Sequence, residues 1–146
     1  MSISKFTFKL TADDYELESA FKVRREVFIK EQGIPQDVVF DNSDRTATHV
    51  IIKYGENVIG TARVRFIENK HAKLERMAIL KPYRGRGLGS RMVSFIVAEM
   101  KNSDIKAIVL NAQYEVIAFY ETCGFQSIGL PLQEAGKKHV KMELRY

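Results

Sequence analysis

The chain has 146 residues, of which 45% are hydrophobic and 28% charged, with three prolines and no tryptophan. This size and composition predict a single globular domain spanning residues 1–146, and they exclude a disordered or collagen-like chain. The formal net charge of +5 favours an anionic partner, which is a nucleic acid, a membrane surface or a phosphate-bearing cofactor.

A lone cysteine, Cys123, excludes an internal disulfide and a cysteine-based zinc cage. The three histidines are scattered without ligand spacing, so we expect no metal. The N-terminus lacks the apolar run of a signal peptide, and no segment approaches the roughly 20 apolar residues of a membrane span. These features predict a cytoplasmic protein.

The N-terminal part of the chain predicts a strand followed by a helix. Apolar residues alternate over residues 3–10, as in a half-buried strand. Thr11 with Asp14 resembles a capping box that opens a helix, and Gly33 with Pro35 ends it. The apolar stripe of this helix is predicted to consist of Leu17, Ala20, Phe21, Val27 and Phe28.

A charged residue, Arg24, falls on this apolar stripe, seven residues after Leu17 and seven before Glu31. A buried charge is costly unless it is paired. We therefore expect Arg24 to meet Glu31 or an aspartate of the polar segment 36–46, which we interpret as a loop.

The middle of the chain predicts a sheet. Three strands joined by short turns are expected to form an antiparallel meander, over residues 48–53, 58–67 and 72–80. A helix follows a glycine-rich segment, and its inward face is predicted to carry Leu88, Met92, Phe95, Ile96 and Met100. The apolar run 107–110 is expected to be a strand covered on both faces and parallel to the strand 72–80.

The C-terminal part predicts a short helix and a last strand. The helix carries Val116, Phe119 and Tyr120, and it stops at Gly124, which suits the left-handed residue after a helix. The strand covers residues 139–144. The whole order predicts an α+β (mixed α/β) fold, in which an antiparallel meander feeds a strand-turn-helix-strand crossover.

The glycine-rich segment 81–91 lies between a predicted strand and a predicted helix. It contains no acid, and its basic residues and glycines are Lys81, Arg84, Gly85, Arg86, Gly87, Gly89 and Arg91. Glycines allow several backbone N–H groups to point at one spot, and a helix N-terminus adds positive charge. The segment therefore predicts a pyrophosphate site. The alternative is a glycine-rich connection with solvated charges, and neither a P-loop nor a dinucleotide-binding turn fits the spacing.

Three blocks of this sequence resemble the GNAT N-acetyltransferase superfamily. Arg84-Gly85-Arg86-Gly87-Leu88-Gly89 matches its Arg/Gln-x-x-Gly-x-Gly/Ala signature. The segment 74–79 looks like its fourth strand, and residues 118–125 are similar to its Phe-Tyr-x-x-x-Gly-Phe motif. Together the blocks cover roughly residues 48 to 128, and three blocks in register are a specific signal.

The resemblance implies a mostly antiparallel sheet in which the fourth and fifth strands splay apart at a bulge. The pantetheine arm of acetyl-CoA lies in the gap and pairs with the exposed backbone of Met77, Ala78 and Ile79. The pyrophosphate-binding residues it implies are Arg84, Gly85, Arg86, Gly87, Leu88, Gly89 and Ser90. An Asn that often contacts the cofactor is Gln113 here, which puts that contact in doubt, and Asn111 is a possible substitute.

The resemblance also implies two catalytic candidates. Tyr120 matches the family tyrosine near the departing sulfur, where its hydroxyl donates a proton to the thiolate or only hydrogen-bonds to it. Glu75 is the leading general base, because a protonated amine must lose a proton before it attacks. The alternatives are that Glu75 only pairs with Arg63 or Arg65 across the sheet, or that a water chain serves.

Residues 24–32 resemble a branch of small bacterial GNAT proteins and, more distantly, the acyl-homoserine lactone synthases. In this superfamily the first helix and the following loop wall the acceptor site, so Arg24, Phe28 and Glu31 are candidate substrate-binding residues. The alternative for Arg24 is an internal salt bridge that holds the loop, and both roles are compatible. Cys123 is interpreted as an inert thiol.

The predicted function is transfer of an acetyl group from acetyl-CoA to a primary amine of a small molecule, by direct attack in a ternary complex. The alternative is a non-catalytic acyl-CoA sensor of the same fold. A nucleic-acid-binding protein and an acyl-homoserine lactone synthase fit less well. We expect no nucleic-acid or membrane partner and a monomer or homodimer. The acidic segment 37–44 mildly favours a cationic acceptor, although simple solvation explains it better.

Overall fold

The computed structural model describes residues 5–146, so the first residues of the predicted N-terminal strand, Ile3 and Ser4, lie outside the described residues. Within this range seven strands form one sheet in the order β1-β2-β3-β4-β5-β7-β6. The strands are β1 (Phe6–Leu10), β2 (Thr48–Tyr54), β3 (Asn57–Ile67), β4 (His71–Ile79), β5 (Ala107–Gln113), β6 (Gln126–Glu134) and β7 (Lys137–Arg145). The β4–β5 pair is parallel and the other neighbours are antiparallel, which confirms the predicted meander and crossover.

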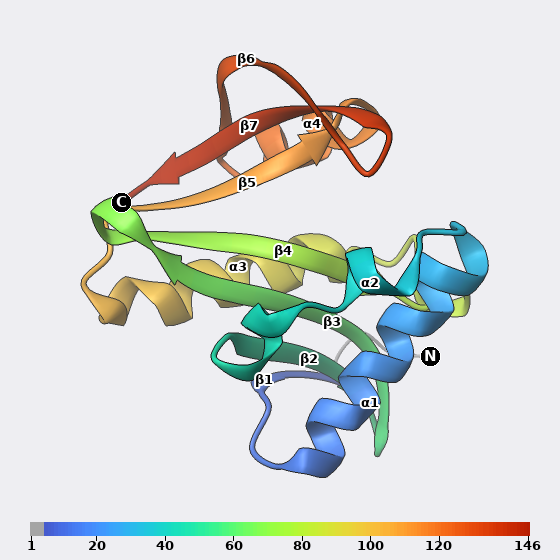
Figure 1. The fold of residues 1–146 in the computed structure, drawn as a ribbon. Helices are drawn as coiled ribbons and strands as arrows, with labels where there is room; N and C mark the ends of the chain where they lie inside the picture. Colours follow the sequence, from blue (N-terminus) through green and yellow to red (C-terminus); the bar gives the residue numbers. More distant parts are fainter. Residues whose placement is uncertain (1–4) are drawn as a thin grey trace.

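Helices cover both faces of the sheet. They are α1 (Asp14–Arg24), which continues as a π-helix over Arg25–Glu31, then α2 (Gln36–Val39), α3 (Leu88–Met100) and α4 (Ile117–Thr122). Figure 1 shows α1 and α2 in front of the sheet and α3 and α4 behind it. The fold is therefore the mixed α+β arrangement that the sequence predicts.

The predicted capping box of Thr11 and Asp14 is wrong, because Asp13 caps α1. A carboxylate oxygen of Asp13 accepts a hydrogen bond from the backbone N–H of Glu16 at 2.8 Å, and Glu16 Oε1 accepts one from Ala12 N at 2.8 Å. Thr11 lies before the cap, in the segment after β1, where its N–H donates to the carbonyl of His49.

Two elements escaped the sequence analysis. The segment interpreted as a loop contains α2 and a single 3₁₀ turn over Asn42–Arg45, and it buries Val39. Strand β6 has a mostly exposed surface, and its register with β7 breaks between Ile128 and Leu132. Neither segment shows a regular apolar period, because tertiary contacts rather than an amphipathic pattern hold them in place.

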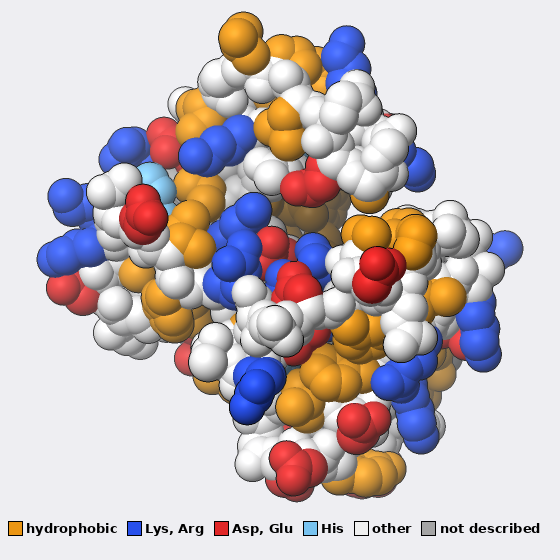
Figure 2. All heavy atoms as spheres, viewed as in Figure 1, with side chains coloured by type: hydrophobic (Ala, Val, Ile, Leu, Met, Phe, Trp, Pro, Cys, Tyr) orange, Lys and Arg blue, Asp and Glu red, His pale blue; other side chains and the backbone are white. Residues whose placement is uncertain are grey.

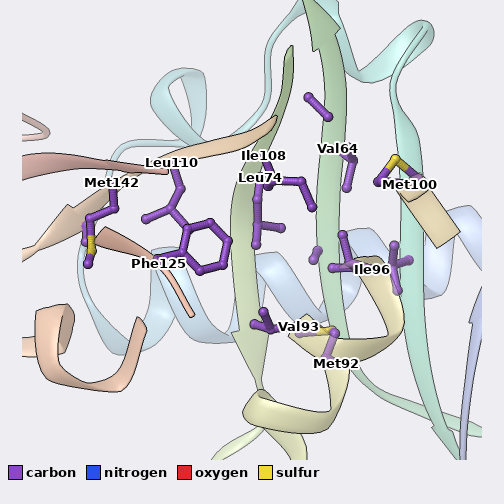
Figure 3. Close-up of a cluster of buried hydrophobic side chains, with 14 of the residues drawn as sticks. Val64, Leu74, Met92, Val93, Ile96, Met100, Ile108, Leu110, Phe125 and Met142 are labelled. Carbon is purple, nitrogen blue, oxygen red and sulfur yellow. The ribbon is translucent and has the colours of Figure 1, made fainter. Parts of the chain in front are cut away.

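The core lies between the sheet and the helices behind it. Of the residues predicted for the inward face of α3, Phe95 is only partly buried, whereas Val93, which was not predicted, is fully buried. Figure 3 shows α3 side chains beneath Val64 and Leu74, and a second group formed by Leu110, Phe125 and Met142 below β5 and β7. On α1 the buried residues include Ala20 and, not predicted, Val23, and Val27 is buried on the π-helix that continues it.

The parallel strands separate soon after they pair. Hydrogen-bonded pairing of β4 with β5 runs from His71 with Ala107 to Lys73 with Val109, whereas β4 continues to Ile79 and β5 to Gln113. Figure 1 shows the two strands diverging from this point. A bulge bends β4 in the diverging part, where the register with β3 shifts and Arg76 has φ 54°.

Truncation of Phe125 should destabilise the part of the core that packs against β5 and β7. Phe125 is 2% exposed, so Phe125→Ala is expected to lower the free energy of unfolding by about 3–5 kcal/mol, through lost burial and a cavity. Urea denaturation followed by circular dichroism measures this change. The control is Phe66→Ala, which removes a ring that is 55% exposed and should cost far less; equal losses would contradict this description of the core.

Candidate active site in the cleft between β4 and β5

A cavity of about 420 Å³ opens where β4 and β5 diverge. Its walls come from the π-helix and α2 on one side, from both diverging strands, and from α4 and the β6–β7 turn on the other. Figure 2 shows the recess from the face that carries α1 and α2, with acidic and basic side chains gathered beside it. The sequence-predicted residues that line it are Phe28, Glu75, Met77, Asn111, Gln113 and Tyr120.

The glycine-rich turn leads from β4 into α3 with two left-handed glycines. Gly85 has φ 77°, and Gly87, the residue that precedes the helix, has φ 76°. The first hydrogen bond of α3 runs from Arg91 N to Gly87 O, so the N–H groups of Leu88, Gly89 and Ser90 come before it in the helix. No heavy atom lies within 4 Å of where a side chain would start at Gly85 or Gly87. The turn therefore has the backbone geometry of an anion cradle.

Arg84 is engaged inside the protein. Its guanidinium donates two hydrogen bonds to the carboxylate of Glu31, at 2.8 and 2.9 Å, and its Nε–H donates to the carbonyl of Ile79. Its backbone N–H donates to Lys81 O. Arg84 and Glu31 therefore tie the glycine-rich turn to the end of the π-helix, and neither is among the residues that line the cavity.

Tyr120 lies on α4 with its ring between two phenylalanines, 5.0 Å from Phe119 and 5.9 Å from Phe125 between ring centroids. Burial, with a smaller effect of Cys123, raises the pKa of Tyr120 to about 12. The phenol is therefore protonated at neutral pH and is a hydrogen-bond donor inside the cavity.

Glu75 pairs with both arginines that the sequence analysis named as its alternative partners. Its Oε1 accepts hydrogen bonds from Arg63 Nη2 at 2.9 Å and from Arg65 Nε at 2.6 Å, and Lys73 Nζ lies 3.6 Å from Oε2. Burial would raise the pKa of this carboxyl, but the hydrogen bond from Arg65 and the nearby cations overcome it and lower the pKa to about 2. A carboxylate this acidic accepts a proton poorly at neutral pH.

A buried charge network extends from Glu75 under α2. Arg24 is fully buried, and its Nη1 donates to Asp44 Oδ1 at 2.8 Å. Of the two partners expected from the sequence, Glu31 or an aspartate of the polar segment, this is the aspartate. Arg63, also fully buried, bonds to Asp41 at 2.6 Å and to Asp44 at 3.0 Å. Two acids of this segment, Asp41 and Asp44, are therefore used for internal ion pairs.

The same network places the candidate substrate-binding residues. Arg76, the left-handed residue of the β4 bulge, donates to the carbonyls of Val38 and Val39 and so holds α2 beside the cavity. Phe28 lines the cavity. Arg24 lies within the charge network and does not line the cavity. It is therefore placed where it can hold the cavity wall in position.

Asn111 and Gln113 lie at the end of β5 and line the cavity. Asn111 Nδ2 donates to Glu134 Oε1 at 3.1 Å. Glu134 and His139, which the sequence analysis did not single out, also line the cavity. No motif marks these two residues, and only their approach across the β6–β7 hairpin brings them to the site.

Among residues 5–146 no group of His, Cys, Asp and Glu side chains is arranged to hold a metal ion. Within that range no helix has the length and apolar composition needed to cross a membrane.

Comparisons with known proteins agree with this geometry. The sequence profile of the acetyltransferase (GNAT) family matches residues 11–125. A relative from Bacillus subtilis strain 168, which carries the name of an acetyltransferase, is 36% identical over 146 residues, covering 97% of this chain and 95% of the relative.

Solved structures show the same fold. The crystal structure of an N-acetyltransferase from Lactobacillus plantarum has a TM-score of 0.91 at 23% identity and covers 96% of this chain and 97% of that one. A Bacillus subtilis acetyltransferase in complex with CoA has a TM-score of 0.73 at 12% identity and covers 97% and 99%. The predicted GNAT-like fold is therefore confirmed.

The ion pairs of Glu75 should make the free energy of unfolding depend on pH in the acid range. The folded-state pKa of about 2 lies below the ordinary value of 4.5, so the stability that Glu75 contributes is present above pH 4.5 and is lost as the pH falls toward 2. Glu75→Gln is expected to lower the free energy of unfolding at pH 7 by roughly 3 kcal/mol and to flatten its fall below pH 5. Urea titrations at a series of pH values measure both effects.

The control for this variant is Glu99→Gln, since Glu99 is exposed on α3. It should leave the pH dependence as in the native protein. A Glu75→Gln variant with the native acid slope would show that this carboxylate does not contribute through its ion pairs.

Proposed function

The chain belongs to the GNAT acetyltransferase family, and we propose that it transfers the acetyl group of acetyl-CoA to a primary amine of a small molecule by direct attack in a ternary complex. The observation that carries this proposal is the unpaired edge of β4 beyond Lys73, which adjoins both the cavity and the glycine-rich turn. Acyl transfer is the chemistry of the family, and the choice of acetyl group and amine is our inference.

The residues present fit acetyl-CoA as the acyl donor. The thioester supplies a carbonyl carbon open to attack and a thiolate that leaves. The backbone of Met77, Ala78 and Ile79 would pair with the amide groups of the pantetheine arm as an added strand does. The N–H groups of Gly85 to Ser90 would hold the pyrophosphate at the start of α3.

Tyr120 is proposed to act as the general acid. Its hydroxyl is protonated at neutral pH, since its pKa of about 12 lies far above 7, and it lines the cavity from the side of α4. Glu75 is proposed to position the site rather than to accept the proton, since two arginines occupy its oxygens. This choice follows the ion-pair alternative of the sequence analysis.

A non-catalytic acyl-CoA sensor would use the same cleft. A buried phenol beside an open strand edge favours catalysis over sensing, because binding of the donor alone needs no proton donor at the sulfur. The two functions are distinguished by release of free CoA, measured by thiol titration, when acetyl-CoA and an amine are both present. Binding of acetyl-CoA without amine-dependent thiol release would indicate the sensor.

Removal of the Tyr120 hydroxyl should affect chemistry more than donor binding. Tyr120→Phe is expected to lower kcat by about 10²-fold or more, since the departing thiolate loses its proton donor. The Kd for acetyl-CoA, measured by calorimetry, should change little because the ring remains. An unchanged kcat would remove Tyr120 from the mechanism.

The cradle predicts that Gly87 tolerates no side chain. Gly87→Glu is expected to abolish acetyl-CoA binding, because φ of 76° strains any L residue and the new carboxylate repels the pyrophosphate. The matched control is Gly55→Glu, which has φ 59° in the β2–β3 turn and lies outside the cleft. This control should fold less stably and still bind acetyl-CoA; a Gly87→Glu protein with native affinity would place the pyrophosphate elsewhere.

A further inference from the structure

His139 and Glu134 face each other across the β6–β7 hairpin and line the active-site cavity. His139 pairs with Gln113 of β5 and with Leu132 of β6, which places it beside the open end of β5. It is 4% exposed, whereas the side chain of Glu134 is 47% exposed. A buried imidazole and a carboxylate that reaches solvent thus meet at one wall of the cavity.

The hydrogen bonds of His139 indicate which nitrogen is free to accept a proton. Its Nδ1 lies 2.9 Å from the carbonyl oxygen of Lys137. A carbonyl only accepts, so Nδ1 carries the hydrogen in the neutral ring, and Nε2 presents its lone pair. This Nε2 lies 3.7 Å from Glu134 Oε2.

Glu134 is held in place by Asn111, whose Nδ2 donates to Oε1 at 3.1 Å. The other oxygen, Oε2, therefore faces His139. The separation of 3.7 Å is too long for a direct hydrogen bond, but an amine nitrogen about 2.9 Å from each atom would contact both. His139 and Glu134 therefore have the geometry of a binding site for an ammonium group.

The remaining charged or titratable groups of this cavity are Glu75, Arg76 and Tyr120. Glu75 and Arg76 are held by internal ion pairs and hydrogen bonds, and Tyr120 is a protonated phenol. Among the residues that line the cavity, His139 supplies the imidazole, and Glu134 is the carboxylate that no arginine neutralises in the described contacts.

We propose that His139 is the general base of this enzyme, that Glu134 binds the ammonium form of the acceptor, and that the acceptor is a cationic primary amine. The proposal deepens the proposed function and rests on it. It assigns the base to β7, on the same side of the cavity as the acid on α4.

The protons and bonds balance with these two residues. The ammonium R–NH₃⁺ gives one proton to Nε2 of His139, and the neutral amine then forms the C–N bond as the C–S bond breaks. Tyr120 gives its proton to the sulfur and regains one from the nitrogen. The products are the amide, the thiol and one proton on His139, which leaves to solvent past the exposed Glu134.

The decisive variant is His139→Gln, tested with 1,4-diaminobutane and acetyl-CoA. At pH 7 we expect kcat/KM to fall by about 10²-fold or more, since the ammonium no longer has a base. The deficit should shrink as the pH rises, because a growing fraction of the amine is already neutral. The Kd for acetyl-CoA should stay native, and the control His71→Gln, outside the cavity, should be fully active.

A native rate in His139→Gln would overturn the inference and leave the proposed function intact. A deficit that is the same at every pH would also overturn it, because a merely structural role predicts that result. If the native protein binds acetyl-CoA but releases no CoA with any amine, the proposed function fails and this inference fails with it.

A binding measurement tests Glu134 without turnover. Calorimetric titration of 1,4-diaminobutane into CoA-bound protein should give an affinity at least about 10-fold weaker for Glu134→Gln than for the native protein, since a charge-assisted contact is lost. The control is Glu115→Gln, which is exposed and outside the cavity. Equal affinities for native and Glu134→Gln proteins would overturn the role of Glu134.

Discussion

The early end of β4–β5 pairing is the constraint on which the site depends. Backbone N–H and C=O groups that leave a ladder must find other partners, or a free-energy cost remains. Beyond Lys73 and Val109 the facing edges of the two strands are free to receive a ligand that itself looks like a strand. The bulge at Arg76 lies in the diverging part of β4, and Leu110, Phe125 and Met142 are part of the buried core.

The buried charge network fixes the wall that faces this cleft. Two fully buried arginines, Arg24 and Arg63, are expensive to desolvate, and they are offset by Asp41, Asp44 and Glu75. The aspartates come from the segment after α2, so the ion pairs bind that segment to the sheet. The same contacts that build the wall occupy Glu75 and lower its pKa, which separates this carboxylate from the chemistry it was first expected to perform.

The proposed acid on α4 and the proposed base on β7 both line the wall of the cavity that adjoins β5. Burial raises the pKa of Tyr120 on α4, whereas the lone pair of His139 is directed by the hydrogen bond that its other nitrogen makes to Lys137 O. The hydrogen bonds from Arg84 to Glu31 join the glycine-rich turn to the π-helix.

The sequence alone determined the features that depend on local spacing. The meander, the left-handed glycine turn before α3 and the Phe119–Gly124 segment were all predictable, because their signals lie within a few residues of one another. Only the tertiary structure decided that Asp13 caps α1, that Arg24 pairs with Asp44, and that Glu75 is held by two arginines. It also brought Glu134 and His139 to the cavity. The physical reason is that a side chain's partner, and therefore its protonation, depends on contacts between residues far apart in the chain, which no local pattern encodes.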